Sequence, residues 1–328
     1  MSSSEPEFND AREYSSLEEV MNTLLTAKGK SFRELDQTGR ALTGGNKGSL
    51  GQIIEESVLK YAINSDAAPD IHIGDTSYEL KVTPLKHIKK GKQTSAKERL
   101  VIDIINYLTL ADETDFESSK MWDKAKNIIL VYYYDDRTDK KKELRIDCKV
   151  LASYLMKYEA DDLATIKNDW HVIRDKVASG HADSLSESDT NYLAACTKGA
   201  NSKQLREAPA PAGANTATIF AKQRAFSLKT SYMTAIARKL LNRKSETVRL
   251  PIPQEQNLDE YVAAKFIPYT GKSSRDIASE LQVSAAPTAK NYNSSLAFAM
   301  LGASKSSISK IEQFSKANIS QFKSVTIY

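Results

Sequence analysis

Residues 70–82 show the alternation of polar and apolar side chains that is typical of two short β-strands joined by a turn. The first run reads Asp-Ile-His-Ile and the second reads Tyr-Glu-Leu-Lys-Val. Gly74, Asp75 and Thr76 between the two runs favour a turn. The pattern therefore predicts a hairpin with its polar side chains on one face and its apolar side chains on the other.

The register of this hairpin depends on the turn. With residues 75–76 as the turn, Asp70 lies opposite Lys81. The same register places His72 opposite Glu79. A three-residue turn would shift the pairing by one residue and mix the two faces. The pattern favours the first register, although Asp-Thr is not a pair that two-residue hairpin turns prefer.

The polar face of this hairpin carries candidate chemistry, because it brings Asp70 and Glu79 near Lys81. Two carboxylates about 4 Å apart repel each other by roughly 4 kcal/mol at a protein surface, unless a proton or a cation lies between them. A hard cation such as Mg²⁺, which prefers oxygen ligands, would relieve this repulsion. The three residues could then activate water against a phosphodiester. The alternative is a solvated strand face with an ordinary cross-strand ion pair.

A helix is predicted from Ser49 onward, because apolar residues recur there at helical spacing. Glu55 lies at the edge of this apolar stripe. From that position it could reach an active site beside the core, or it could be a surface residue, and helix geometry does not choose between the two. The stripe consists of Leu50, Ile53, Ile54, Val58 and Tyr61.

The remaining patterns predict a mixed α/β fold. Ser16 and Glu19 have the spacing of a capping box, which would open a helix that reaches to about residue 27. The other predicted elements are a helical turn at 31–36, a helix at 97–110, a buried strand at 127–134, a short strand at 144–146, a polar helical region at 151–191 and a surface loop at 208–214.

Several blocks of sequence resemble, in order and spacing, the MutH-like branch of the PD-(D/E)xK nucleases. This branch contains the nicking enzymes of mismatch repair and the type II restriction endonucleases that cut at GATC. The resemblance implies a restriction-endonuclease-like core of the α/β (α+β) class, with a mixed central sheet flanked by helices. The blocks are residues 47–55, Asp70, residues 78–84, residues 197–201 and residues 224–238.

Carried over by position, the resemblance implies a metal site at the hairpin. Asp70 and Glu79 would bind Mg²⁺ together with the backbone carbonyl of Leu80. Lys81 would orient or deprotonate the attacking water, and Glu55 would support a metal ion or its water shell. The implied reaction is metal-assisted hydrolysis of a phosphodiester.

The same resemblance implies a DNA-reading region downstream. Lys198 would read a base, and a lysine can donate to O6 and N7 of guanine in the major groove. Ser227 stands where the repair enzymes have a tyrosine linked to the sensing of adenine methylation, so this chain leans away from a repair role. The full set of implied DNA-binding residues is Lys47, Lys198, Arg224, Ser227 and Lys229.

The distribution of charge says more than the net charge of +4. Residues 81–99 contain seven Lys or Arg and one acid, and residues 222–244 contain seven with no acid. These two clusters could line a DNA groove, or they could be solvated faces. The chain has two cysteines, no arginine-rich or apolar leader and no apolar run of membrane-spanning length, which favours a cytoplasmic protein without a membrane partner.

A later part of the chain is similar to an earlier one. Residues 250–253 read Leu-Pro-Ile-Pro and indicate a domain boundary. Beyond it, residues 269–277 are similar to residues 27–35, and residues 321–323 are similar to residues 79–81.

Gln321 takes the place of a metal-binding carboxylate in this second copy, which should make the copy catalytically silent. The arrangement resembles the longer GATC-cutting restriction enzymes, in which a degenerate MutH-like domain binds DNA as an effector. We therefore expect a MutH-like catalytic domain at residues 1–250 and an incomplete second MutH-like domain, non-catalytic and DNA-binding, at residues 251–328.

The expected function is that of a Mg²⁺-dependent type II restriction endonuclease that cuts double-stranded DNA on the 5′ side of the G in GATC. Its partners would be GATC-containing DNA and a cognate DNA methyltransferase, and it would act as a monomer or as a DNA-induced dimer. Two alternatives stay open at this point. One is a MutH-type GATC nicking enzyme of mismatch repair, and the other is a DNA-binding remnant that no longer cuts.

Overall fold

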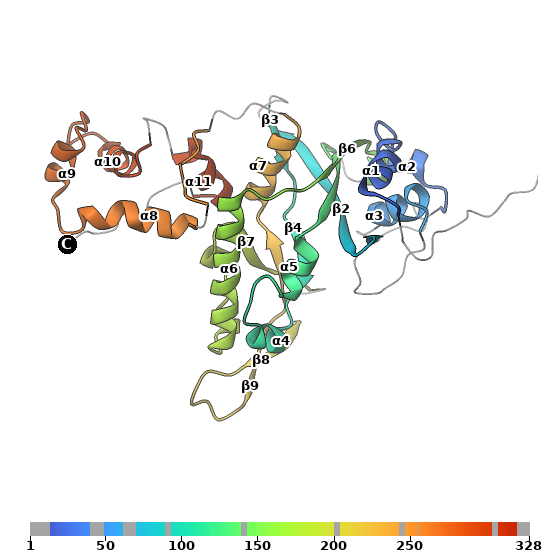
Figure 1. Cartoon of the computed structure of the whole chain (residues 1–328), viewed down its shortest axis with the longest axis horizontal. Helices are drawn as coiled ribbons and strands as arrows, with labels where there is room; N and C mark the ends of the chain where they lie inside the picture. Colours follow the sequence, from blue (N-terminus) through green and yellow to red (C-terminus); the bar gives the residue numbers. More distant parts are fainter. Residues whose placement is uncertain are drawn as a thin grey trace, which may run out of the picture. The chain divides into compact units, whose positions relative to one another are not determined.

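A computed structural model of the chain describes residues 14–39, 49–61, 70–88, 93–138, 143–199, 204–242, 247–254, 256–303 and 308–319. The chain divides into two compact units, coloured along the sequence in Figure 1. Unit 1 comprises residues 1–103 and 117–157, and unit 2 comprises residues 104–116 and 158–328. Both units combine helices with strands, which confirms the predicted α/β class.

The sheet of unit 1 contains five strands in the order β1-β2-β5-β6, with β3 (Gln93–Ala96) also paired to β2. β1 (Ile71–Ile73) is antiparallel to β2 (Thr76–Ile88). β2 is parallel to β5 (Ile128–Tyr134), and β5 is antiparallel to β6 (Val150–Leu155). The sheet is therefore mixed, as expected, and its central strand β5 is the buried strand predicted at 127–134.

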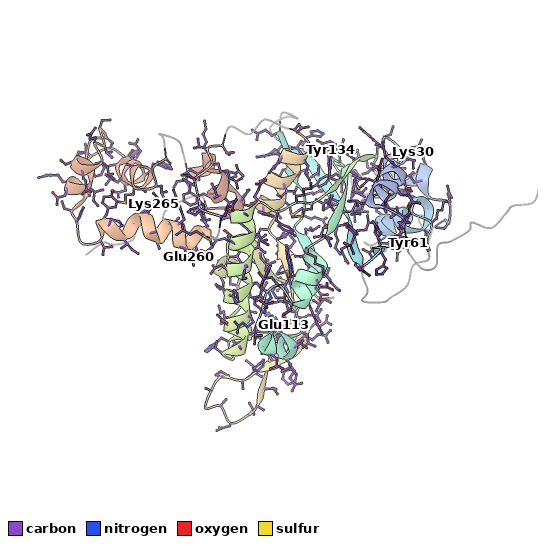
Figure 2. All side chains as sticks on the ribbon, viewed as in Figure 1. Lys30, Tyr61, Glu113, Tyr134, Glu260 and Lys265 are labelled. Carbon is purple, nitrogen blue, oxygen red and sulfur yellow. The ribbon has the colours of Figure 1, made fainter. Side chains whose placement is uncertain are left out.

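Helices pack on this sheet, α1 (Leu17–Leu25) against β6 and α3 (Ser49–Ile53) against β2. Their apolar faces form one buried cluster with the sheet, and Tyr61, labelled in Figure 2, is fully buried within it. The other elements of this part of the chain are α2 (Phe32–Leu35), the π-helical turn η2 (Ile54–Val58), β4 (Leu100–Ile104), α5 (Lys120–Ala125) and the 3-10 turn η3 (Arg145–Asp147).

The caps of the first two helices explain where those helices begin. The Ser16 hydroxyl accepts the amide of Glu19 at 3.1 Å, as predicted, but the Glu19 carboxylate turns back to Ser15 instead of completing the box. Ser31 and Glu34 form a full capping box at α2. Each cap satisfies an amide that the first helical turn leaves without a partner.

Three of the predicted elements are wrong. Residues 97–110 are not one helix, because the β-branched run before residue 105 forms β4 and a separate helix, α4 (Tyr107–Asp112), begins after the Asn106 cap. Residues 144–146 contribute to η3 instead of a strand. The region 151–191 begins as strand β6, whose backbone pairs with β5, before the long helix α6 (Ala160–Ala178).

In unit 2, β7 (Leu193–Thr197) is antiparallel to β10 (Arg224–Leu228). β8 (Leu205–Pro209) and β9 (Thr218–Lys222) form a separate hairpin. The remaining elements are η4 (Ala182–Ser184), η5 (Glu187–Asp189), α7 (Thr230–Leu240), α8 (Leu258–Phe266), η6 (Ile267–Tyr269), α9 (Ser274–Glu280), α10 (Tyr292–Met300), η7 (Ile308–Lys310) and α11 (Glu312–Ala317). Within the described ranges, no helix is long and apolar enough to span a bilayer.

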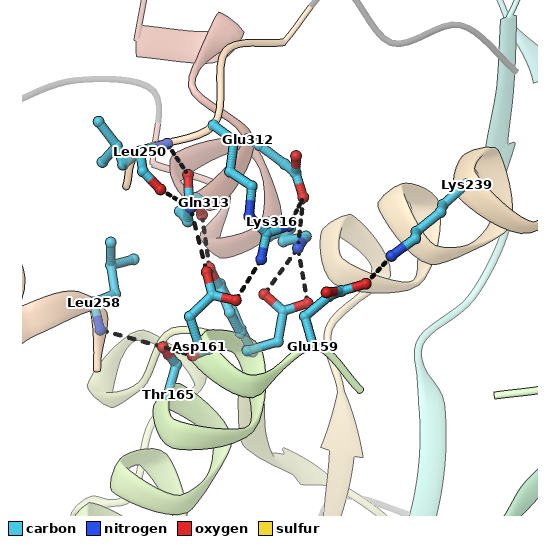
Figure 3. Close-up of polar contacts among 12 residues, drawn as sticks. Glu159, Asp161, Thr165, Lys239, Leu250, Leu258, Glu312, Gln313 and Lys316 are labelled. Carbon is cyan, nitrogen blue, oxygen red and sulfur yellow. Dashed lines mark hydrogen bonds and ion pairs between the residues drawn. The ribbon is translucent and has the colours of Figure 1, made fainter. Parts of the chain in front are cut away.

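A buried polar network joins α11 to α6 (Figure 3). The Lys316 ammonium lies 2.7 and 2.8 Å from the two oxygens of Asp162, and the two side chains are 4% and 0% exposed. The Gln313 amide group donates to the carbonyl of Leu250 and accepts from its N–H, at 3.1 and 3.0 Å. Arg249 adds ion pairs to Asp161 and to Glu312 of α11. The two compact units divide at residues 103–104, 116–117 and 157–158, and the domain boundary at residue 250 stays a prediction.

The two segments with similar sequences also share local structure. Gly29 and Gly271 both adopt left-handed backbone angles, with φ of 82° and 80°. Ser31 and Ser273 follow at the same spacing, and each caps the next helix through its hydroxyl. These features support the predicted repeat, but the described residues after 251 contain no strand, so an incomplete second domain at 251–328 stays a prediction. Residues 321–323, where the second copy would have its key strand, lie outside the described residues.

Candidate active site

The β1–β2 hairpin forms in a different register from the predicted one. His72 pairs with Ser77 instead of Glu79, so Gly74 and Asp75 are the two turn residues and the predicted register is wrong by two residues. Gly74 has a φ of 54°, which glycine adopts without strain and which a tight hairpin turn requires at its first position. Because the shift is even, every side chain stays on its predicted face.

The observed register brings the two candidate carboxylates closer than predicted. Continued by one pair, it places Asp70 directly opposite Glu79. The backbone N–H of Leu80 donates to Asp70 Oδ2 at 2.7 Å, a short hydrogen bond to a charged group. Asp70 is therefore held against the peptide that follows Glu79.

Glu79 and Lys81 lie on the same face of β2, since they are two residues apart along a strand. The Lys81 ammonium is 2.5 Å from Glu79 Oε1, and both side chains are half-buried. The structure therefore places Glu79 and Lys81 in contact and binds Asp70 to the neighbouring Leu80 amide, whereas a site formed by all three side chains stays a prediction. The two carboxylates are oxygen donors that suit Mg²⁺, which protein sites commonly hold through one or two carboxylates plus water and phosphate oxygens.

In the described structure, Glu55 does not form a three-carboxylate metal site with Asp70 and Glu79. It lies half-buried in η2, where its backbone carbonyl accepts the amide of Tyr61 at 3.2 Å. No group of three or more His, Cys, Asp or Glu side chains in the described part of the chain is placed to hold a metal ion. The supporting role of Glu55 stays a prediction. Lys47, the predicted backbone contact, lies outside the described residues.

Lys198 is exposed directly after β7, a position from which a side chain can reach a ligand. Its backbone N–H donates to the carbonyl of Gln223 at 3.0 Å, which fixes the point where the chain leaves the strand. Its predicted base-reading role is compatible with this exposure.

The other predicted DNA-binding residues of unit 2 are turned toward the protein. Ser227 is 0% exposed and its hydroxyl donates to the carbonyl of Ala194, so its side chain faces the protein in this conformation and its assignment as a DNA contact stays a prediction. The Lys229 ammonium donates to the carbonyl of Thr190, and burial lowers the pKa of Lys229. Arg224 is half-buried and donates to the carbonyl of Ala195 at 2.8 Å, so both cations serve the strand framework.

Asp169 of α6 positions the strand that leads to Lys198, and the sequence analysis missed it. Its carboxylate accepts the backbone amides of Asn191, Tyr192 and Leu193 at 2.8, 2.6 and 2.9 Å. Burial raises the pKa of Asp169 to about 7 despite these three donors. An acid on the apolar stripe of α6 was the available signal, since a buried carboxylate needs partners.

Comparison with known proteins first shows which protein family part of the chain resembles. Residues 59–169, which include the hairpin with Asp70, Glu79 and Lys81, match the family model of the DNA mismatch repair enzyme MutH. The resemblance to the MutH-like branch is thereby confirmed over this segment of the chain.

Individual relatives include a restriction enzyme and mismatch repair proteins. The chain is 36% identical over 93% of its length to the type II restriction enzyme Sau3AI of Staphylococcus aureus, and it covers 61% of that protein. It is 26% identical over 67% of its length to the DNA mismatch repair protein MutH of Shewanella woodyi, and it covers 90% of that protein. The MutH of Shewanella sp. strain MR-7 is also 26% identical, over 60% of the chain and 80% of that protein. The chain thus spans about three fifths of the restriction enzyme that it matches.

Proposed function

We propose that the protein is a type II restriction endonuclease that hydrolyses double-stranded DNA at GATC, on the 5′ side of the G, with Mg²⁺ as its cofactor. The observation that carries this proposal is the Leu80 amide, which holds Asp70 beside the Glu79–Lys81 pair on one strand face. The similarity to Sau3AI over 93% of the chain supports restriction, because it extends well beyond the segment shared with the MutH family.

In this proposal Asp70, Glu79 and the Leu80 carbonyl hold the cation. When bound, Mg²⁺ polarises the scissile phosphate and lowers the pKa of a water molecule. Asp70 can keep one orientation throughout, because the Leu80 amide anchors one of its oxygens. Lys81 lies on the same face and would orient the attacking water and offset the negative charge that develops on the phosphate.

A MutH-type nicking activity is the second candidate, because the chain covers 90% of the Shewanella woodyi MutH but only 61% of Sau3AI. Identity favours restriction, at 36% against 26%. A chain that binds DNA without cutting it is the third candidate.

The purified chain should be incubated with a supercoiled plasmid that contains one GATC site, in Mg²⁺, in Ca²⁺ and in EDTA. We expect linear DNA in Mg²⁺ only, with a 5′-phosphate before the G, and no change in a plasmid without GATC. Open circles that never become linear would favour nicking instead. A mobility shift without any cut would favour the non-cutting binder.

The biological partners follow from the same proposal. A GATC-cutting enzyme requires a cognate DNA methyltransferase that protects the host's own sites in the cytoplasm. Plasmids methylated at adenine and at cytosine within GATC should be compared with unmethylated plasmid, because protection by one modification identifies that methyltransferase's target base. Sedimentation with and without a GATC duplex distinguishes a monomer from a DNA-induced dimer.

A further inference from the structure

The β8–β9 hairpin presents an aromatic side chain to solvent. Phe220 is 70% exposed, more than any other large apolar residue in the described part of the chain, and Leu205 of the same hairpin is 51% exposed. Figure 1 shows the hairpin projecting beside α4, past the end of α6. Exposing one phenylalanine is common, but here two large apolar side chains lie on one narrow hairpin.

The pairing of the hairpin explains why these side chains point outward. Glu207 pairs with Phe220, and Leu205 pairs with Lys222. The intervening residues Ala208 and Ala221 are buried on the inner face, and β8 packs against α4. Because strand residues alternate between faces, the outer face consists of the two apolar side chains with Lys222, Glu207, Pro209 and Thr218.

The hairpin is held rigidly at its loop. Gly180, which follows α6, has a φ of 83°, and a Cβ there would lie 2.2 Å from the backbone nitrogen of Pro211. Only glycine allows this close approach of two backbones. The N–H of Ala210 donates to the carbonyl of Ala217 at 3.0 Å and closes the loop. A strand whose backbone is fixed in this way loses little backbone conformational entropy when it binds a ligand.

The open end of the hairpin is joined to Lys198 through one residue, the buried Gln223. Its carbonyl accepts the Lys198 amide and its own amide donates to the carbonyl of Gln204, both at 3.0 Å. Its side-chain oxygen accepts from Nε of Arg206 of β8 at 2.7 Å. Both ends of the stretch that connects β7 to β8 are therefore fixed at Gln223, so Lys198 and the hairpin share one anchor.

The hairpin and the residue that follows β7 carry more cations than acids, which suits a polyanion, although Glu207 is the direct cross-strand partner of Phe220. Lys198, Arg206 and Lys222 lie on or next to the hairpin, whereas Glu207 is the one acid of its two strands. The Glu207 carboxylate accepts a hydrogen bond from the Thr218 hydroxyl at 2.7 Å. Two apolar side chains are too few for a stable protein interface, which needs a far larger area, whereas one aromatic ring suffices to stack on a base or to wedge between base steps.

We propose that the outer face of the β8–β9 hairpin is a second DNA-contacting surface, on which Phe220 stacks against a base next to the sequence read from Lys198 and Lys222 meets a neighbouring phosphate. The proposal rests on the proposed function for its ligand, DNA. It adds a contact that does not depend on the hydrolytic residues of the β1–β2 hairpin.

The test measures binding of the full chain to a fluorescent GATC duplex in Ca²⁺, where cleavage does not interfere. Phe220→Ala should raise the Kd by about 5- to 100-fold, the loss typical of one aromatic–base stack, and Phe220→Trp should restore most of the affinity. Ile267→Ala is the matched control, because Ile267 is 67% exposed on η6, and its Kd should not change. An unchanged Kd for Phe220→Ala would overturn the proposal.

Two further readouts separate stacking from a general loss of affinity. A duplex with 2-aminopurine at the bases flanking GATC should brighten on binding the original chain and not on binding Phe220→Ala. Lys222→Ala should lower the slope of log K against log salt by about 0.9, as expected for one lost phosphate contact. If neither readout changes in its variant, the hairpin does not touch DNA. If the original chain binds no duplex at all, both proposals fail, whereas cleavage at GATC with unchanged Phe220→Ala binding overturns this one alone.

Discussion

Acidic side chains are used differently in the two units. In unit 1, Asp70 and Glu79 are half-buried on a strand face, with one ammonium and one backbone amide as partners. In unit 2, Asp162 and Asp169 are fully inaccessible, one paired with Lys316 and the other bound by three backbone amides. The fully enclosed carboxylates hold segments of the fold together, whereas the half-buried ones are accessible in part to solvent.

The pKa values of buried acids also differ between the two units. Burial raises the pKa of Asp162, although Lys316 opposes this rise. In unit 1, burial would likewise raise the pKa of Asp135, but hydrogen bonds from Arg137 and Lys97 outweigh it and hold that pKa well below its usual range. Burial alone therefore does not fix the charge of an acid, because the number and kind of donors decide it.

The largest effect should come from the hairpin acids. Asp70→Asn or Glu79→Gln should lower the single-turnover cleavage rate by roughly 10³-fold or more, because the cation loses a charged ligand, while Kd for DNA in Ca²⁺ changes little. Asp75→Asn is the matched control, since Asp75 is an exposed acid in the turn of the same hairpin. Cleavage by Asp70→Asn at the rate of Asp75→Asn would remove Asp70 from the active site.

The next effect concerns stability in unit 2. Lys316→Met should lower the free energy of unfolding by about 3–5 kcal/mol, because it leaves the Asp162 carboxylate buried without its cation. Urea unfolding measures the change, with Lys290→Met as the control at an exposed lysine. Adding Asp162→Asn to Lys316→Met should recover part of the loss. A loss no larger than that of the control would show that the pair is not buried in solution.

The third effect is a pH dependence. The folded-state pKa of Asp169 is raised from 3.8 to about 7, so the folded state holds a proton that the unfolded state has lost. Stability should therefore fall as the pH rises from about 4 to about 7, by at most about 1.4 kcal/mol per pH unit. Asp169→Asn should flatten this slope when unfolding is followed at several pH values. An identical slope in the variant would assign the titration to another group.

Asp135 of unit 1 should give stability the opposite dependence on pH. Because its folded-state pKa is lowered from 3.8, its contribution to stability is present above pH 4 and is lost as the pH falls through the folded-state pKa. Asp135→Asn should consequently lower the free energy of unfolding at pH 7, and this loss should become progressively smaller toward acid pH.

The smallest expected difference lies between two helix caps. Ser31→Ala and Ser273→Ala each remove one hydroxyl that accepts a helical amide, at a typical cost of about 1 kcal/mol. Both hydroxyls also donate to the acid three residues further on, but Ser31 is buried whereas Ser273 is exposed. Ser31→Ala should therefore cost more, and thermal unfolding of both variants measures the difference. Equal losses would mean that burial adds nothing to the cap.

Local patterns predicted the elements whose signals are local. The apolar run of β5, the helical turn at residues 31–36 and the two faces of the β1–β2 hairpin were all readable from neighbouring residues. The register was not, because it depended on which two residues turn, and Gly74 decided it through its backbone angle. β4 was mistaken for helix because its short run is compatible with both periods until a pairing partner is known.

The proximity of residues within one hairpin could be predicted from the sequence, whereas contacts between distant segments could not. Asp70, Glu79 and Lys81 lie within one supersecondary element. The burial of Ser227 was not predicted, because β10 is buried on both faces after its first residue and alternation gave no sign of which side chains are exposed. The partner of Asp162 could not be predicted, since no short-range pattern links residues 154 positions apart.

This separation along the chain has a consequence for the order of synthesis. A ribosome that adds about 5–20 residues per second needs roughly 8–30 s to pass the 154 residues from Asp162 to Lys316. During that interval the amino end of α6 carries an acid whose permanent counter-charge has not yet been made. Unit 2 is therefore completed late in translation, long after the hairpin with Asp70 and Glu79 has emerged, and a nascent chain holds these two acids before α11 can pair with α6.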